Sequence, residues 1–210
     1  MKINLGCGTN YVEGYENLDK SPNVWMSKFK LLKKVLFIFK IIDVNHMKNW
    51  NSNIIYKDIR KLNYQSNSIS HIYSSHTLEH IYFWEAEKVI NDCYQILAPG
   101  GKLRLALPDL DQFIDKYLAG RKTDPYQSAI EFDKELLSYP INKPKFLEYF
   151  ISYFFNHVHK WHPTKAVVIG ILKTAGFKGV TEQKFCEGDF PDLELLENRS
   201  DFTFYLESYK

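Results

Sequence analysis

The sequence predicts an α/β fold built on a doubly wound, mostly parallel sheet. Three observations lead to this prediction. Short apolar runs alternate with segments of helical periodicity, several of the runs stop at glycine or aspartate, and no repeat or low-complexity linker divides the chain. The 210 residues, of which 45% are hydrophobic, are enough for one large core. We therefore expect a single domain over residues 1–210, with inserted helices.

Seven segments have the length and apolar content of β-strands. They are residues 2–5, 15–18, 53–56, 69–74, 102–107, 180–185 and 202–209. Residues 85–97 place apolar side chains at helical spacing, and Pro99-Gly100-Gly101 is expected to end that helix. A second helix is expected up to Ala175, with Thr164 as its N-cap and Gly176 after its last turn.

Two insertions interrupt this alternation. Residues 24–50 contain the segment 25–42, which is apolar but carries five lysines. It is too short and too charged to cross a bilayer, which takes roughly 20 mostly apolar residues. We expect an amphipathic helix that either forms a lid over a site or contacts a membrane surface. Residues 119–160 form the second insertion, which is helical and rich in aromatic residues.

Composition excludes several classes of protein. The three cysteines, Cys7, Cys93 and Cys186, are far apart and form no CxxC pair, which argues against a disulfide framework or a zinc ribbon. The net charge of +2 shows no excess of basic residues for nucleic acid. No secretory signal is recognisable. We expect a cytoplasmic protein that binds no nucleic acid, and one alternative adds peripheral contact with a membrane through residues 25–42.

A glycine-rich turn follows the first predicted strand. In INLGCGTN, Gly6 and Gly8 would let the backbone approach a ligand closely, although a simple tight turn is the alternative. Asp19 and Asp58 follow the second and third strands, and ligands of open parallel sheets bind beyond such strand ends. The usual fingerprint places an acid about 20 residues after the glycines. Asp19 comes only 11 positions after Gly8, so a loop must replace the first crossover helix.

The motifs LGCGTNYVEGYENLD, YKDIRKL, IYSSHTLEHI and ILAPGGKLRLALPDL resemble, in this order, those of class I S-adenosylmethionine-dependent methyltransferases. Together with HKWHPTKAVVIGILKTAGFKGV, they resemble more narrowly a group of short bacterial and viral methyltransferases linked to polysaccharide biosynthesis. The resemblance covers the chain apart from residues 25–52 and parts of 119–155. It implies a Rossmann-like sheet of seven strands whose last strand is antiparallel, and S-adenosylmethionine (SAM) as the cofactor.

The resemblance also implies the residues that bind the cofactor. They are Leu5, Gly6, Cys7, Gly8, Asp19, Asp58, Ile59, Ser75 and His76. Asp19 would hold the ribose and Asp58 the adenine amine, with Ile59 along the ring. Ser75 and His76 would flank the transferred methyl group. The chain departs from the family pattern at Asn4, where many members have an acid, and at Asn10, where many have a third glycine.

Methyl transfer to a hydroxyl requires close alignment and usually a base. Our first candidates for the base are His76, because histidine titrates near neutral pH, and Asp109, because it follows the fifth predicted strand. On a helix His76 and His80 would share a face, but HTLEH is not the HExxH zinc motif, so we expect no metal there. His80 is expected to have a structural role at a helix start.

Two further possibilities concern the acceptor side. Asp109, Asp111 and Asp115 could supply oxygen ligands to a divalent cation, or they could simply cap a helix. The residues expected to contact the substrate are His80, His159, Trp161 and His162. For the histidine-rich stretch from His157, a packed loop is the alternative.

The sequence therefore predicts a SAM-dependent O-methyltransferase that acts on a sugar hydroxyl of a surface glycan or its precursor. One alternative acceptor is a small aromatic or lipid-like metabolite. Another alternative is a non-catalytic binding module that retains the fold. The oligomeric state is left open.

Overall fold

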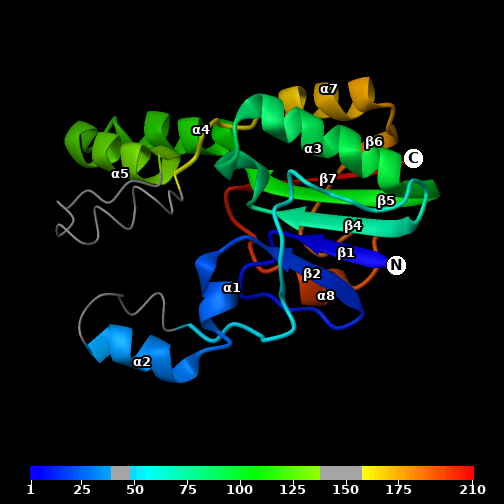
Figure 1. The fold of residues 1–210 in the computed structure, drawn as a ribbon. Coiled ribbons are helices and arrows are strands. Elements are labelled where there is room, and N and C mark those ends of the chain that lie inside the picture. The colour runs from blue at the N-terminus through cyan, green and yellow to red at the C-terminus, as the bar shows by residue number, and fades with distance from the viewer. Residues whose placement is uncertain (39–47, 138–157) are drawn as a thin grey trace.

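A computed structural model describes residues 1–38, 48–137 and 158–210. Its centre is a seven-stranded sheet with the order β3-β2-β1-β4-β5-β7-β6 (Figure 1). The strands are β1 (Lys2–Leu5), β2 (Tyr15–Asp19), β3 (Ile55–Tyr56), β4 (Ile69–Ser75), β5 (Leu97–Pro108), β6 (Lys178–Gln183) and β7 (Thr203–Tyr209). All seven predicted strands are present, with shifted ends.

The pairing of the strands confirms the predicted fold class. β1 pairs in parallel with β2 on one side and with β4 on the other, and β4 pairs in parallel with β5. β7 is antiparallel to both β5 and β6. The strand order reverses between β1 and β4, which is the position where open α/β sheets bind their ligands.

Helices cover the sheet on one face, and one short helix with loops covers the other (Figure 1). The helices are α1 (Pro22–Met26), α2 (Lys30–Ile38), the 3₁₀ turn η2 (Leu78–His80), α3 (Phe83–Ile96), α4 (Leu110–Gly120), α5 (Pro125–Leu137), α7 (Lys165–Ala175) and α8 (Leu193–Leu196). α3 and α7 contact each other, α3 lies against β5 and α7 against β6 and β7, whereas α8 lies on the opposite face. The predicted caps of α7 are confirmed: the Thr164 side chain accepts from the Val167 amide, and Gly176 has φ of 103°.

Apolar side chains form a separate core on each face. The larger core joins the sheet to α3 and α7 and includes Ile72, Leu103 and Ile171. On the other face a smaller core contains Val12 and Phe190. Residues 6–14 contain no helix, as predicted, so the loop that carries Val12 takes the place of the first crossover helix.

One predicted strand boundary was wrong. α3 ends at Ile96, before Pro99-Gly100-Gly101 as predicted, but β5 begins at once at Leu97 and not at Lys102. The backbone at this turn is instead held by the end of β7: the Gly100 amide donates to the Lys210 carbonyl, and the Lys210 amide donates to the Gly101 carbonyl. Tertiary pairing therefore overrides the local turn signal.

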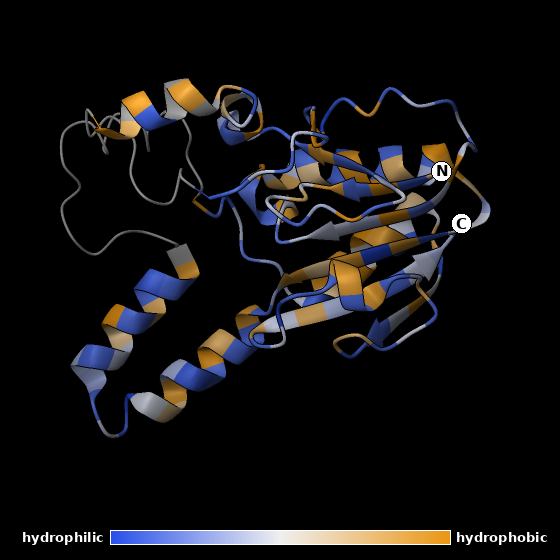
Figure 2. Ribbon diagram, turned by 90° about the horizontal axis from the view of Figure 1, so that it is seen from below, coloured by the Kyte–Doolittle hydropathy of each residue, from blue (hydrophilic) through white to orange (hydrophobic). Residues whose placement is uncertain are grey.

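The segment 25–42 is not one helix. α1 begins after the N-cap Ser21, with Pro22 in its first turn, and a break follows before α2. α2 projects from the edge where the parallel strands end, and so does the α4–α5 pair (Figures 1 and 2). Residues 39–47 and 138–157, which are parts of the two predicted insertions and include His157, lie outside the described residues. No helix in the described ranges is long and apolar enough to cross a membrane.

A buried ionic network links β5 to β7 and to the segments on either side of α8. Arg104 is fully buried, and its Nε donates to Oε1 of Glu197 at 2.7 Å. Its Nη1 donates to Oε2 of Glu207 at 3.2 Å, and the guanidinium also donates to the carbonyls of Lys184 and Glu187. Every side of the planar cation is therefore bonded, which is the condition under which burial of such charges is tolerated.

Replacing Arg104 by methionine should lower the free energy of unfolding by about 3–5 kcal/mol, because two carboxylates would be left buried without their cation. Urea denaturation at pH 7 measures this change. The matched control is Lys116→Met, which breaks the exposed pair with Glu135 and should cost at most about 1 kcal/mol. Equal losses in the two variants would contradict the central role of the network.

Candidate functional site

The glycine turn after β1 needs its two glycines for different reasons. Both have positive φ, 65° at Gly6 and 57° at Gly8. A Cβ on Gly6 would lie 2.1 Å from Oγ1 of Thr77, so this glycine allows the end of β1 to pack against the residue after His76. A Cβ on Gly8 would meet no atom within 4 Å, so the second glycine borders open space at the strand edge. A ligand can approach the backbone there.

Asp19 braces this turn. Its Oδ2 accepts from the Gly8 amide at 2.8 Å and its Oδ1 from the Ser21 amide at 2.6 Å. The carboxylate thus ties the end of β2 to the end of β1, and its role toward ribose stays a prediction. Burial, and then the charge of Asp19, raises the pKa of the Cys7 thiol, so Cys7 is a packing residue and no nucleophile.

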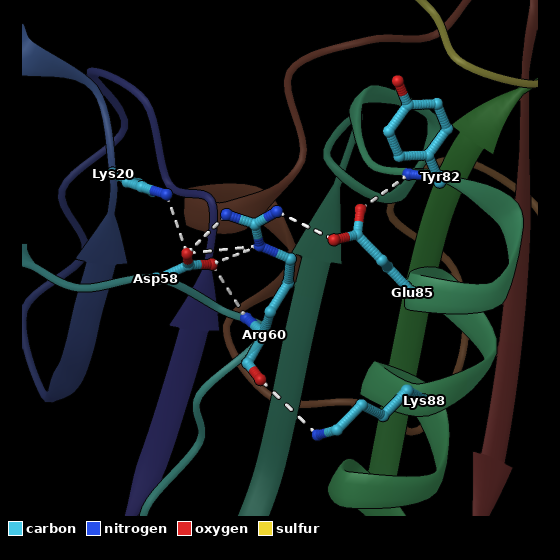
Figure 3. A network of polar contacts seen from close by, with 6 residues as sticks. All are labelled: Lys20, Asp58, Arg60, Tyr82, Glu85 and Lys88. Atoms are coloured by element: carbon cyan, nitrogen blue, oxygen red, sulfur yellow. Dashed lines mark hydrogen bonds and ion pairs between the residues drawn. The ribbon is translucent and has the colours of Figure 1, made fainter.

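Asp58 belongs to an ionic chain that runs from Lys20, after β2, to Glu85 in α3 (Figure 3). Arg60 donates to Asp58 from its backbone amide, Nε and Nη2, and Lys20 donates from Nζ at 2.8 Å. Nη1 of Arg60 continues to Glu85, which accepts from the Tyr82 amide at the start of α3. The Arg60 guanidinium is the main reason that the pKa of Asp58 lies well below its usual range.

These contacts change two predicted roles. The Asp58 carboxylate already accepts from two cationic side chains, so the structure gives it an ion-pairing role that the sequence did not predict. Ile59 is 6% exposed and packs within the larger core, which leaves little of its side chain to line an adenine ring. Leu5 is likewise a core residue, so any contact of Leu5 with a ligand would come from its backbone.

His76 follows β4 directly and has φ of 46°, an uncommon backbone conformation for a residue other than glycine. Its amide donates to the Ala106 carbonyl of β5, and its Nε2 lies 3.0 Å from Oγ1 of Thr203 on β7. The Thr203 hydroxyl donates to the Asp201 carbonyl, so Nε2 is the donor to Thr203. Nδ1 is then the nitrogen that can accept a proton, and it lies 3.4 Å from Oε1 of Glu79.

Ser75 and Thr77 flank this histidine. The Thr77 hydroxyl lies within hydrogen-bonding distance of the carbonyls of Ser75, Leu5 and Gly6, at 2.9–3.4 Å. The end of β4 is thereby held against the glycine turn. The structure brings His76 and the turn together, as predicted.

Asp109 has a different role from the predicted base. It is 1% exposed and caps α4: Oδ1 accepts from the Asp111 amide at 3.2 Å and Oδ2 from the Gln112 side chain at 2.9 Å. Both oxygens are therefore engaged, which disfavours proton removal. Asp109, Asp111 and Asp115 also form no candidate cation group among the described residues. The capping alternative is the one that the structure supports.

The predicted substrate residues divide into a histidine cluster and a structural tryptophan. The rings of His80 and His159 are 5.1 Å apart and those of His159 and His162 are 6.0 Å apart. Burial lowers the pKa of each of these three rings. Trp161 instead donates from Nε1 to the Leu78 carbonyl and packs edge-on against Phe83, so it fastens the loop to the body of the protein.

Glu79 is a site residue whose role the sequence did not predict. Its side chain is fully buried, and neither carboxylate oxygen has a hydrogen-bond partner among the residues that the structure describes. The Lys160 amide donates to the Glu79 carbonyl at 2.7 Å, which holds the loop 158–162 against η2. The sequence signal that could have identified Glu79 is its position between two histidines in HTLEH. Its burial could not be predicted, because it depends on the loop 158–162, which is distant in the sequence.

The strand order β3-β2-β1-β4-β5-β7-β6, with β7 antiparallel, is that of the class I methyltransferase fold. Residues 39–105, about a third of the chain, match the family model described as a methyltransferase domain. SAM is the cofactor that this family implies. Among curated proteins, no sequence matches.

Solved structures of distant sequence share the fold. A SAM-dependent methyltransferase from Archaeoglobus fulgidus is 15% identical, with a TM-score of 0.53 over 100% of this chain and 85% of that one. One from Mesorhizobium loti is 17% identical, with a TM-score of 0.51 over 100% and 90%. One from Methanosarcina mazei is 14% identical, with a TM-score of 0.52 over 100% and 91%. At these identities the comparison establishes the fold alone.

The low pKa of Asp58 predicts a pH-dependent effect on stability. Because the folded pKa lies below the unfolded value, the ion pairs stabilise the fold above about pH 5, and this contribution is lost as the pH falls through the folded pKa. Asp58→Asn should therefore cost about 1 kcal/mol at pH 7, a figure reduced by the exposure of Lys20 and Arg60. The difference from the wild type should shrink as the pH falls toward 3.

Urea denaturation at pH 7, 5 and 3 measures this difference. Asp133→Asn, at an exposed position of α5, is the control and should change stability by less than about 0.5 kcal/mol at each pH. A difference for Asp58→Asn that does not vary with pH would show that the ion pairs do not stabilise the fold.

Proposed function

We propose that the protein is a SAM-dependent O-methyltransferase whose acceptor is a sugar hydroxyl of a surface glycan or of its precursor. The observation that carries the transfer to oxygen is the placement of His76. This histidine stands at the ligand edge of the sheet, beside the glycine turn, with one ring nitrogen anchored by Thr203 and the other facing Glu79. The acceptor class rests on the resemblance of the sequence to short methyltransferases of polysaccharide biosynthesis.

The residues of the site suit proton removal from a hydroxyl. When bound, SAM supplies an electrophilic methyl group. Nδ1 of His76 would accept the proton of the acceptor hydroxyl, and the Glu79 carboxylate at 3.4 Å would stabilise the imidazolium that forms. Thr203 holds the ring in one orientation and tautomer. His76 is thus the base of the proposed reaction, and Asp109 is not needed for it.

Asp19→Ala should weaken SAM binding at least about tenfold, because it removes the acceptor of the Gly8 amide and the predicted ribose contact. Isothermal titration calorimetry of the full chain with SAM measures the affinity. Asp133→Ala is the control and should bind SAM as the wild type does. If SAM does not bind the wild type, the chain is a binding module that retains the fold, and the enzymatic proposal fails.

The acceptor is tested in cells. Mass spectrometry of surface glycans from a strain that lacks the protein should show the loss of one O-methyl group, restored by the wild-type chain and not by His76→Ala. An unchanged methylation pattern would exclude the glycan.

One observation favours the second candidate, a small aromatic or lipid-like acceptor. A small cavity beside His159 and His162 is lined mainly by apolar residues, among them Leu110, Phe113 and Leu136. Its volume of about 10 Å³ is room for no more than one water molecule, so it offers an apolar wall to a neighbouring group and no pocket for a whole acceptor ring. In vitro methylation assays with both compound classes distinguish the two acceptors.

Peripheral membrane contact through residues 25–42 remains part of this proposal. α2 exposes Leu31 at 78% and Ile38 at 73%, beside exposed Lys34. The double variant Leu31→Ser and Ile38→Ser should lose its co-sedimentation with anionic lipid vesicles, because burial of apolar side chains drives such binding. The control Tyr126→Ser changes an exposed residue of α5 and should bind as the wild type does. If the wild type does not sediment with vesicles, the segment does not contact membranes.

A further inference from the structure

The buried carboxylate of Glu79 requires a compensating partner. Its side chain is 0% exposed, and neither oxygen accepts a hydrogen bond from the described residues. Burying a carboxylate without a partner costs several kcal/mol, so buried charges are paired or bind metal ions. The groups nearest to it are imidazoles: Nδ1 of His76 at 3.4 Å and Nε2 of His80 at 3.9 Å from Oε1.

A third nitrogen ligand comes from a distant part of the chain. One ligand atom each of Glu79, His80 and His159 lies within 4.8 Å of the other two. His159 reaches this position because the loop 158–162 is bonded to η2 through the Lys160 amide and the Trp161 indole. Two segments that are 79 positions apart thus supply one carboxylate and two imidazoles to a single point.

The His159 ring is also oriented as a metal ligand usually is. Its Nδ1 lies 3.1 Å from the Leu136 carbonyl, whereas Nδ1 of His80 is buried with no hydrogen-bond partner among the described residues. When one ring nitrogen donates to a carbonyl, the other carries the lone pair, which is the usual second contact of a histidine that binds metal. For His159 this places the lone pair on Nε2.

We propose that Glu79, His80 and His159 bind a divalent transition-metal ion. Two imidazoles and one carboxylate are the ligand set of catalytic zinc and of non-haem iron, and they leave coordination positions open. Such ligands lie about 2.0–2.2 Å from the ion and therefore roughly 3.4 Å from one another in a tetrahedral site. Binding would draw the three ligand atoms together from their separation of up to 4.8 Å. A carboxylate has about four acceptor positions, so Glu79 can bind the ion and keep its contact with His76.

The role of the ion rests on the proposed function. His159 also lines the cavity next to α4, so an open coordination position would face the acceptor side. An acceptor hydroxyl bound there would lose its proton more readily. The proton would pass to Nδ1 of His76 as the oxygen forms its bond to the methyl carbon. The bond between that carbon and the sulfonium sulfur would break, and its electron pair would stay on sulfur as a thioether.

Calorimetry with Zn²⁺ on the tag-free, chelator-treated full chain tests the site. We expect one ion per chain, bound more than about 100-fold more weakly by Glu79→Gln and by His159→Ala, which exceeds the 10–100-fold cost of losing an outer partner. Co²⁺ in place of Zn²⁺ should give visible absorption bands that both variants lack. His71→Ala, which changes a histidine on β4 that packs against Phe190, is the control and should keep both signals.

SAM binding and circular dichroism of each variant separate loss of the metal from loss of folding. If Zn²⁺ fails to bind the wild type, or binds Glu79→Gln and His159→Ala equally well, the metal site is refuted. Glu79 would then be compensated by an imidazolium. If Zn²⁺ binds as expected while surface glycans keep their methyl groups, the metal site stands and the glycan proposal fails.

Discussion

The parallel pairing of β1 between β2 and β4 is the interaction on which the rest of the structure depends. It places the carboxyl ends of three strands side by side, although they are separated by up to about 70 positions in the sequence. The glycine turn, Asp19 and His76 follow these ends, and each contributes a contact that closes the edge. Asp19 bonds to the Gly8 amide, and Thr77 packs on Gly6. The proposed cofactor side of the site is therefore a direct result of strand order.

The acceptor side depends on contacts of longer range. Thr203 reaches His76 from β7, and the loop 158–162 is bonded to η2, which follows β4. The Arg104 network supports this arrangement because it joins β5 to β7, the strand that carries Thr203. Burial of Glu79 follows from the same loop. The two sides of the site thus depend on different parts of the chain, and a change in the acceptor-side loop need not disturb the glycine turn.

Local patterns predicted the features that short-range physics decides. The seven apolar runs, the caps Thr164 and Gly176 and the loop in place of the first helix are all present, because each depends on neighbouring residues. The start of β5 was missed since its backbone partners lie at the other end of the chain. The break before α2 was missed because apolar content does not show where one helix stops and the next begins.

The same distinction applies to the site. The glycine turn and His76 were predicted together because they follow neighbouring strands. The pairing of Asp58 with Arg60 depends on a side-chain conformation, and the meeting of Glu79 with His159 depends on the packing of a loop. Neither leaves a periodic pattern in the sequence. The contact between His76 and Thr203 spans 127 positions and adds a consequence for the order of folding. Contacts of such separation form late and slowly. A refolding chain would therefore complete the glycine turn before it fixes the orientation of His76, so the proposed cofactor site would form earlier than the proposed base.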